Sequence, residues 1–582
     1  FSKGRHFVFI GGKVSNPIIE FKDFSFKYKV QAEPTLFNID LKIYEGEKIL
    51  ICGPSGCGKS TLSNTLNGLI PESYSGDITG SLLIDGKSYK DYDIFSLSKI
   101  TGTVLQDSDS QFIGLTVGED IAFALENDSV ELKEMKEAVL EAAKKVGMEA
   151  YLNSSPQALS GGQKQRVSLA GVMVDKVKIF LFDEPLANLD PLSGKKTIEL
   201  IDELHKTTNA TIVIIEHRLE DVLYRPVDRV ILMSEGRIIS DKTPDELLSS
   251  NDLIEYGIRE PLYVTALKYA GVKITKEMRP GRIDTLSLSD EDKKAVEAWF
   301  KNIPDKNEKE KGEILLDIKN LSFKYPEGKE ALKDINFTLR RGEMMSIVGK
   351  NGAGKSTFSK VICGFEKEDK GTLTLLGRSL DELSIKERAD HIGYVMQNPN
   401  QMITKPMIKD EIALGLKIRG ILSDEEIEKR VQEALTICGL RPFKSWPISA
   451  LSYGQKKRVT IATILAMKPE IIILDEPTAG QDFRHYTDIM EFLKSLNEKG
   501  VTIILITHDM HLMLEYCTRA VVFTDGEKIA DESPEKILTN TTLTEKASLK
   551  KTSLSLLASM CSLNDTEFIK RFIQYDREVR RK

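Results

Sequence analysis

The sequence predicts an α/β fold built as two tandem copies, each with a largely parallel sheet at its core. Three observations support this. Short apolar runs alternate with longer amphipathic stretches, the whole alternation occurs twice, and each copy carries a glycine-rich loop directly after a strand-like run. Wholly apolar runs of strand length are typical of parallel strands buried on both faces. Amphipathic helices between such strands would cover the sheet.

The individual elements can be placed from their residue patterns. The runs 179–182 and 211–215 are short and almost wholly apolar, which predicts two buried strands. The stretches 133–146 and 424–438 repeat apolar residues at helical spacing, which predicts two amphipathic helices. The longest apolar runs, such as 501–506, fall far short of the ~20 residues that span a bilayer. We therefore expect a soluble chain that is not itself a channel.

Five segments of the first half recur 291 to 297 residues later. The pairs are 24–28 with 321–325, 53–61 with 349–357, 159–163 with 451–455, 179–185 with 471–477, and 212–217 with 503–508. A period of this length indicates two homologous domains rather than a solenoid. Between the copies, residues 290–313 are dense in charge and predict a solvated connector.

Composition excludes several classes of protein. The 582 residues include 81 Lys and Arg against 88 Asp and Glu, a net charge of −7. This balance gives no global attraction to nucleic acid or to an anionic membrane. The basic stretch 570–582 is most simply a solvated helix end, with contact to phospholipid heads as the alternative.

The pattern Gly-x-x-x-x-Gly-Lys-Ser starts at Gly53 and again at Gly349. Glycines allow the backbone to wrap around phosphates, and the following helix directs its positive end to the same point. The lysine would neutralise phosphate charge and the serine hydroxyl would bind Mg²⁺. The predicted nucleotide-binding residues are Gly53, Pro54, Ser55, Gly56, Cys57, Gly58, Lys59, Ser60 and Thr61, and Gly349, Lys350, Asn351, Gly352, Ala353, Gly354, Lys355, Ser356 and Thr357; Ser60 and Ser356 are also predicted metal ligands.

The six cysteines are scattered and form no Cys-x-x-Cys pair. This disfavours a disulfide framework or a zinc site and suits a reducing compartment. Cys57 lies inside the first glycine-rich loop, so we expect that alkylation of its thiol blocks ATP binding there and that ATP protects it.

An acidic pair closes an apolar strand in each copy, Asp183-Glu184 and Asp475-Glu476. Alone, such a pair is usually only a strand end. Beside a phosphate loop, the aspartate can hold Mg²⁺ and the glutamate can polarise the attacking water. We therefore predict Asp183 and Asp475 as metal ligands, and Glu184 and Glu476 as catalytic residues.

Further polar residues follow neighbouring strands. His217 and His508 end wholly apolar strands, where an open α/β sheet gathers its site. A neutral imidazole there can contact a γ-phosphate or orient water, although a purely structural histidine is the alternative. Gln106 and Gln397 follow short strand-like runs, and their amides can ligate Mg²⁺.

With Leu159-Ser-Gly-Gly-Gln163 lying between a phosphate loop and an Asp-Glu strand end, the chain resembles the ATP-binding cassette family. The resemblance covers both copies and implies P-loop NTPase domains, each with a helical signature subdomain. It also implies a head-to-tail intramolecular dimer in which each phosphate loop meets the other copy's signature and two ATP are bound. The implied signature residues are Ser160, Gly161, Gly162, Gln163, Ser452, Tyr453, Gly454 and Gln455.

Other positions match or depart from the family pattern. Tyr28 and Tyr325 stand where the family places an adenine-stacking aromatic, with packing at a strand edge as the alternative. Tyr453 replaces a signature glycine, and its side chain could crowd a phosphate. Glu184 and Glu476 are both present. We therefore expect two active but unequal sites, the first being the weaker.

A finer resemblance is to the ATPases of energy-coupling factor importers. It rests on 106–112, 116–123 and 397–401, and on 254–272, which resembles their helical tail. A fused pair is most similar to the tandem ATPase of hydroxymethylpyrimidine (thiamine-precursor) uptake. The resemblance implies a transmembrane coupling subunit, a substrate-binding membrane subunit, a place on the cytoplasmic face of the membrane through these partners, and uptake of a vitamin, a vitamin precursor or a metal ion.

The expected domain limits follow. They are an N-terminal extension at 1–16, a first nucleotide-binding domain at 17–248, a helical tail and charged linker at 249–312, a second nucleotide-binding domain at 313–540, and a C-terminal helical tail at 541–582.

The alternative is a soluble twin-cassette ATPase that acts on ribosomes or nucleic acid. Such proteins carry a long charged helical hairpin between their cassettes. Here the helix-breaking residues Pro261, Gly271, Pro280, Gly281 and Pro304 interrupt that segment. We therefore expect no nucleic-acid partner. The complete catalytic sets also disfavour a scaffold that binds no nucleotide.

Overall fold

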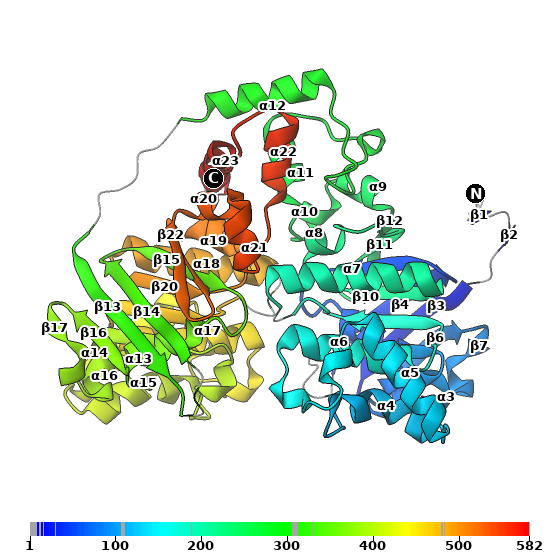
Figure 1. Cartoon of the computed structure of the whole chain (residues 1–582), viewed down its shortest axis with the longest axis horizontal. Coiled ribbons are helices and arrows are strands. Elements are labelled where there is room, and N and C mark those ends of the chain that lie inside the picture. Colours follow the sequence, from blue (N-terminus) through cyan, green and yellow to red (C-terminus); the bar gives the residue numbers. More distant parts are fainter. Residues whose placement is uncertain are drawn as a thin grey trace. The chain divides into compact units, whose positions relative to one another are not determined.

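The structure is a computed structural model of the whole chain (Figure 1). It describes residues 17–29, 31–105, 111–187, 189–304, 312–326, 328, 330–478, 481 and 483–580, and the backbone of two short strands, β1 (Phe9–Ile10) and β2 (Lys13–Val14). The chain forms two compact units: Phe1–Leu189 with Ser193–Lys293, and Asp190–Leu192 with Lys294–Lys582. In the part of the chain that is described, no helix is both long and apolar enough to cross a membrane.

The first unit contains a six-stranded sheet, parallel except at one edge, and a four-stranded antiparallel sheet. In spatial order the larger sheet consists of β12 (Arg237–Lys242), β11 (Arg229–Ser234), β5 (Lys48–Cys52), β10 (Thr211–Ile215), β9 (Ile179–Asp183) and β8 (Thr101–Val104). The smaller consists of β4 (Leu36–Tyr44), β3 (Pro17–Tyr28), β6 (Gly76–Ile84) and β7 (Lys87–Ser88).

The second unit repeats this arrangement strand for strand, which confirms the predicted fold class and duplication. Its larger sheet consists of β18 (Ile392–Val395), β19 (Ile471–Asp475), β20 (Thr502–Ile506), β15 (Met344–Gly349), β21 (Arg519–Thr524) and β22 (Glu527–Glu532). Its antiparallel sheet consists of β14 (Glu330–Arg340), β13 (Ile314–Lys324), β16 (Lys370–Leu375) and β17 (Arg378–Ser379).

Burial explains the two kinds of sheet. Every residue of β5, β10 and β20 is buried, as expected of central parallel strands covered on both faces. In β4, buried and more exposed residues largely alternate, which is the pattern of an antiparallel strand with one face on the core. The core of the first unit lies between its two sheets and also contains Leu62 and Leu66 of the helix after the glycine-rich loop. The antiparallel sheets were not among our predictions, although this alternation was available in the sequence.

The helices cover the parallel sheets. The first half of the chain contains α1 (Lys59–Leu66), α2 (Leu69–Glu72), α3 (Ile94–Ser98), α4 (Val117–Asn127), α5 (Leu132–Lys145), α6 (Gly161–Met173), α7 (Pro191–Thr208), α8 (Leu219–Val222), α9 (Pro244–Leu248), α10 (Asp252–Glu255), α11 (Leu262–Tyr269) and α12 (Asp290–Asn302). The second half contains α13 (Lys355–Cys363), α14 (Ile385–His391), α15 (Ile408–Arg419), α16 (Asp424–Ile437), α17 (Tyr453–Ala466), α18 (Phe483–Glu498), α19 (Met510–Tyr516), α20 (Pro534–Thr539), α21 (Thr541–Lys546), α22 (Ser553–Met560) and α23 (Asp565–Val579).

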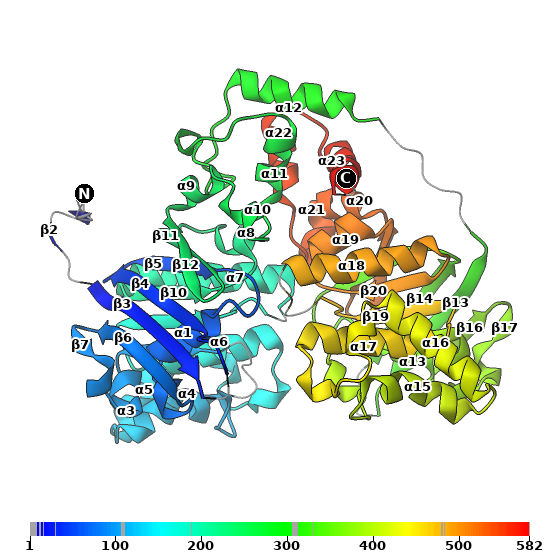
Figure 2. The same ribbon diagram turned by 180° about the vertical axis from the view of Figure 1, so that it is seen from behind.

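In each unit, three helices form a separate cluster. Helices α4, α5 and α6 pack on one another in the first unit, and α15, α16 and α17 do so in the second (Figure 2). The predicted helices at 133–146 and 424–438 are α5 and α16. The Leu-Ser-Gly-Gly-Gln segment and its counterpart stand at the start of α6 and α17, so each cluster is the expected signature subdomain.

The charged stretch that follows the first copy is not simply solvated. Its residues 290–302 form α12, in which Val296 and Trp299 are buried. The Trp299 ring lies 6.0 Å from the ring of Phe568 and 5.4 Å from that of Tyr575, both on α23. The prediction of a solvated connector was wrong for Val296 and Trp299, whereas Asp290 and Lys301 of the same helix are exposed. Apolar residues three positions apart give the charged helix one apolar face, and that face packs on the C-terminal helix α23.

The basic C-terminal stretch is likewise held within the second unit. Arg577 donates hydrogen bonds to the backbone oxygens of Leu514 and Glu515 at the end of α19. Arg580 donates two bonds of 3.3 Å to the buried Glu515 carboxylate and pairs with Asp576 at 2.9 Å. These arginines therefore dock α23 on α19, and our interpretation of this end as solvated was wrong for both of them.

We expect Arg580→Ala to loosen this contact, because it removes two hydrogen bonds from a buried carboxylate. The cost should be about 2 kcal/mol in the opening free energy of α19 and α23. Amide hydrogen exchange of peptides from both helices measures it. Lys536→Ala is the control, since its pair with Glu532 is exposed and worth about 0.5 kcal/mol. Equal effects of the two variants would contradict the assignment.

Candidate active site

Each glycine-rich loop connects a buried central strand to a helix, β5 to α1 and β15 to α13. Gly58 and Gly354 stand just before these helices, both with φ of 101°, a conformation that side chains disfavour. A Cβ on Gly53 would lie 2.2 Å from a backbone oxygen of β11, and one on Gly349 would lie 2.0 Å from a backbone oxygen of β21. Close packing against the neighbouring strand therefore requires glycine at the start of each loop.

The lysine of each loop lies within the curve of its own backbone. The Lys59 ammonium donates to the carbonyl oxygens of Gly53 and Pro54, both at 2.9 Å. The Lys355 ammonium donates to Gly349 at 2.7 Å and to Lys350 at 2.9 Å. Both lysines are buried. A positive charge thus stands beside loop amides and a helix N-terminus, which is the chemistry that binds phosphate.

The two predicted adenine-stacking tyrosines contact the same loops. The Tyr28 hydroxyl hydrogen-bonds the Thr61 hydroxyl at 3.1 Å, and Tyr325 hydrogen-bonds Thr357 at 3.0 Å. Tyr28 also packs edge-on against Phe26, with ring centroids 4.7 Å apart. Each tyrosine is therefore tied to the first helical turn after the loop, while its stacking on adenine stays a prediction.

The two predicted catalytic glutamates share an unusual backbone. Glu184 has φ of 48° and Glu476 has φ of 45°, the left-handed region. For a residue with a side chain this costs about 1–3 kcal/mol and often marks a functional position. Each backbone N–H is held by a carbonyl of the neighbouring strand, Ile215 or Ile506, at 2.9 Å. The same left-handed backbone in both units sets the direction in which each glutamate side chain leaves the end of its strand.

The histidines lie beside these glutamates, but not equally close. His217 Nε2 is 2.9 Å from Glu184 Oε1, whereas His508 Nε2 is 3.5 Å from Glu476 Oε1. Burial alone would raise the pKa of Glu184, but His217 and Lys59 outweigh it and lower that pKa. Burial, together with Asp475, raises the pKa of Glu476. The two sites therefore differ electrostatically.

The aspartates also differ between the units. Burial and the Glu184 charge raise the pKa of Asp183 to about 6. Asp475 Oδ2 accepts a hydrogen bond from the Tyr394 hydroxyl at 2.9 Å and another from the Ser356 hydroxyl at 3.2 Å. Serine and aspartate oxygens side by side suit Mg²⁺, which prefers oxygen ligands. Among the described residues, no three His, Cys, Asp or Glu side chains form a metal-binding group by themselves.

A buried residue that our sequence reasoning missed connects two parts of the first site. Glu216 accepts hydrogen bonds from the backbone N–H of Leu186 at 3.1 Å and from that of His217 at 2.6 Å. It therefore links the segment after Glu184 to the histidine. In the second unit Thr507 takes its place, and its hydroxyl lies 3.4 Å from Glu476 Oε2. Comparing the two copies position by position would have shown this exchange.

The signature segments form helix caps. Ser160 caps α6 and Ser452 caps α17, each in a reciprocal pair with the glutamine three residues on, Gln163 or Gln455. A capped helix directs its first backbone N–H groups outward, which suits a phosphate. Gln106 lies outside the described residues. The pairing of each signature with the other copy's phosphate loop stays a prediction.

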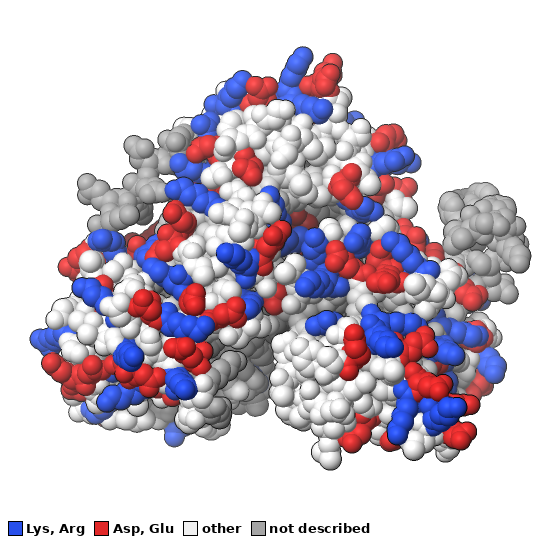
Figure 3. All heavy atoms as spheres, in the orientation of Figure 1, with Lys and Arg blue, Asp and Glu red and all other residues white. Residues whose placement is uncertain are grey.

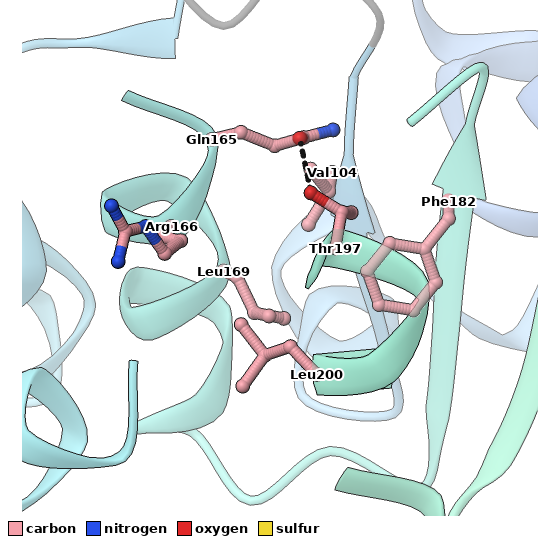
Figure 4. A pocket seen from close by; sticks show the side chains of 7 residues that line it. All are labelled: Val104, Gln165, Arg166, Leu169, Phe182, Thr197 and Leu200. Carbon is pink, nitrogen blue, oxygen red and sulfur yellow. Dashed lines mark hydrogen bonds between the residues drawn. The ribbon is translucent and has the colours of Figure 1, made fainter. Parts of the chain in front are cut away.

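A small cavity lies behind the first signature helix (Figure 4). It has room for about one water molecule, which makes it a packing gap between α6, α7, β8 and β9 rather than a ligand site. In it, the Gln165 side chain accepts a hydrogen bond from Thr197 at 3.1 Å and donates one to the Pro185 carbonyl. The lining residues are Val104, Gln165, Arg166, Leu169, Phe182, Thr197 and Leu200.

Cys57 is buried, and burial raises the pKa of its thiol in spite of the nearby Lys59. The thiolate is the reactive form, so alkylation should be slow at pH 7 and should speed up as pH rises. We expect ATP to slow it further. Mass spectrometry of the Cys57 peptide after iodoacetamide, with urea-unfolded chain as the reference, measures this. Labelling at pH 7 as fast as in the unfolded chain would contradict it.

Comparisons with known proteins agree with this geometry. Residues 36–187 and 332–479 each match the family model described as "ABC transporter", and residues 250–323 match one described as "ATP-binding cassette cobalt transporter". A Clostridium perfringens relative named as an ABC transporter ATP-binding protein is 59% identical over 97% of this chain and 99% of its own length. An Enterococcus faecalis relative of the same name is 56% identical over 97% of this chain and 100% of its own length.

Among solved structures, cbiO1 of Clostridium perfringens, described as part of the ABC transporter complex cbiONQ, is 34% identical, with 41% of this chain and 94% of that chain covered and a TM-score of 0.38. The two matched cassettes together cover more than half of the chain, and both relatives align along nearly all of it. The chain therefore belongs to the ABC transporter family, as an ATP-binding protein with two tandem ABC ATPase cassettes.

Proposed function

We propose that this ATPase is the motor of an importer of the energy-coupling factor type. The observation that carries the proposal is the match of residues 250–323 to a cobalt-transporter model, because these residues follow the first cassette and contain α10, α11 and α12. The motifs after each phosphate loop, 106–112 and 397–401, support the same importer type by resemblance.

The transported compound in this proposal is a vitamin, a vitamin precursor or a metal ion. The tandem layout resembles the ATPase of hydroxymethylpyrimidine uptake, while the model over 250–323 has cobalt in its description. Selection of the compound belongs to a membrane subunit, since the ATPase acts through partners at the cytoplasmic face of the membrane. The described residues accordingly contribute ATP chemistry and docking.

In each cassette the proposed chemistry starts with the phosphate loop. Loop amides and the lysine ammonium would bind the phosphates of ATP, and a bound Mg²⁺ would supply further neutralisation of phosphate charge. The oxygens of Ser60, Asp183 and Gln106 would hold this ion in the first cassette, and those of Ser356, Asp475 and Gln397 in the second. The glutamate at the strand end accepts a proton from the attacking water, and the adjacent histidine orients the glutamate and the γ-phosphate.

Exposed apolar residues beside the signature subdomain support a membrane partner. Ile113 and Leu115 are 65% and 83% exposed, and they directly precede α4 in the segment after Gln106. In the second unit Ile418 and Ile421 are similarly exposed at the end of α15. We propose that cytoplasmic helices of the coupling subunit cover these residues, since apolar side chains this exposed are typical of interaction sites.

Charge distribution does not favour the ribosomal or nucleic-acid alternative. On the face drawn in Figure 3, Lys and Arg are mixed with Asp and Glu, and neither sign dominates. In the described part of the segment between the cassettes, the longest helix is α12 with 13 residues. The long charged hairpin of the alternative class is not formed by these residues.

We expect single glutamate variants to lose ATPase activity unequally. Tyr453 was expected to weaken the first site, but the contact of 2.9 Å between Glu184 and His217, against 3.5 Å between Glu476 and His508, favours the opposite order. With both sites needed in each turnover, Glu184→Gln should lower kcat about 100-fold and Glu476→Gln about tenfold. Steady-state phosphate release by the full chain measures both, with the exposed Glu137→Gln on α5 as the control. Equal losses in the two variants would contradict unequal sites.

The importer proposal is tested by purifying the tagged chain from detergent-solubilised native membranes and identifying its partners by mass spectrometry. We expect one coupling-type membrane protein and one small, very hydrophobic membrane protein. Ile113→Asp with Leu115→Asp should lose both partners and keep ATPase activity, whereas Leu132→Asp, an exposed leucine on the same subdomain, should keep them. Recovery of ribosomal proteins without a membrane protein would overturn the proposal.

A further inference from the structure

The second signature helix is bonded to the loop that carries Gln397. The Tyr453 hydroxyl donates to the Gln397 carbonyl at 3.2 Å. The Lys457 ammonium donates to the carbonyls of Met396 and Gln397, both at 2.8 Å. Lys456 adds a longer contact of 3.4 Å to the loop residue Asn400. Residues four apart lie on one helix face, so Tyr453 and Lys457 reach the same loop together.

Because Lys457 is buried, separating the loop from α17 is energetically costly. Lys457 is 1% exposed, and a buried ammonium without acceptors is costly. Its acceptors are two consecutive backbone carbonyls, so a shift of the loop away from α17 would leave the buried ammonium without them. Tyr453 is 42% exposed and adds its bond at the rim, where the helix begins.

The first signature helix is connected differently. Gly161 occupies the position of Tyr453 and has no side chain to donate. Gln165 occupies the position of Lys457, and its amide oxygen accepts a hydrogen bond from Thr197 (Figure 4). Its amide nitrogen donates to the carbonyl of Pro185, directly after Glu184. Among the described residues, the first signature helix therefore bonds the segment after the catalytic strand, and the second bonds the loop after β18.

We infer that Tyr453 and Lys457 are positioning residues that join the loop 396–400 to the signature helix α17, so that the two segments move as one body. This gives the tyrosine that replaces a signature glycine a function other than crowding a phosphate. The inference rests on the proposed function in one respect, the role of Gln397 toward Mg²⁺. Under that role, the position of Gln397 in its own site and the position of the second signature depend on each other.

Amide hydrogen exchange of the full chain tests the connection directly. The amides of Gln401, Met402 and Ile403 are hydrogen-bonded within the loop. Tyr453→Phe and Lys457→Met should each speed their exchange about tenfold and leave strand β15 unchanged. Lys457→Gln, which introduces the residue of the first unit, should match Lys457→Met, and Lys457→Arg should restore protection. Thr463→Ala is the control, because its hydroxyl bonds within α17.

A double-mutant cycle tests whether the residues act through Gln397. Tyr453→Phe should lower ATPase kcat about threefold in the native background and have no effect in Gln397→Ala, because coupled residues give non-additive effects. Additive losses, or unchanged exchange in Tyr453→Phe, a variant that retains the aromatic ring, would overturn the inference. The exchange measurement needs no membrane partner, so failure to recover partners would count against the importer proposal alone.

Discussion

Each cassette is organised around one loop in which backbone N–H groups and an ammonium meet without side chains between them, an arrangement that suits a polyphosphate. The loop begins so close to the neighbouring strand that even a methyl group at Gly53 or Gly349 would overlap a backbone oxygen. The loop follows the carboxyl end of a central parallel strand that is buried on both faces, and open α/β sheets gather their sites at this edge. The acids and histidines lie at the same edge of the sheet, because they follow the ends of neighbouring parallel strands.

The duplication preserved this architecture while altering the side chains that connect its parts. Glu216 and Thr507 occupy equivalent positions in the two units. In the first unit the buried Glu216 carboxylate accepts a hydrogen bond from the His217 backbone, whereas in the second unit the Thr507 hydroxyl lies beside Glu476. Tyr394, which bonds Asp475, stands where the first unit has Thr103. Backbone geometry is shared, down to the left-handed glutamates, but hydrogen bonding is not. Two cassettes with the same motifs can therefore differ in charge state and in which segments move together.

The tail helices show how charged sequence can still be packed. Helix α12 carries Asp, Glu and Lys along most of its length, yet Val296 and Trp299 form an apolar face against α23. At the other end of α23, Arg580 pairs with the buried Glu515 of α19, the helix that follows His508. The second cassette thus connects its histidine strand, its C-terminal helix and the preceding linker helix through contacts within one unit.

The sequence by itself determined the duplication, the parallel strands, the phosphate loops and the residues at the strand ends. These are local features: strand and helix periods, glycine spacing and motif order are set by neighbours along the chain. Only the tertiary structure decided which residues from distant parts of the chain contact each other, such as Lys457 with Gln397 or Arg580 with Glu515. These contacts join residues about 60 positions apart, and charge or polarity in the sequence does not indicate whether such a side chain is solvated or buried against an acceptor. The physical reason is that burial and hydrogen-bond partners are properties of the packed fold, whereas the motifs are properties of the chain.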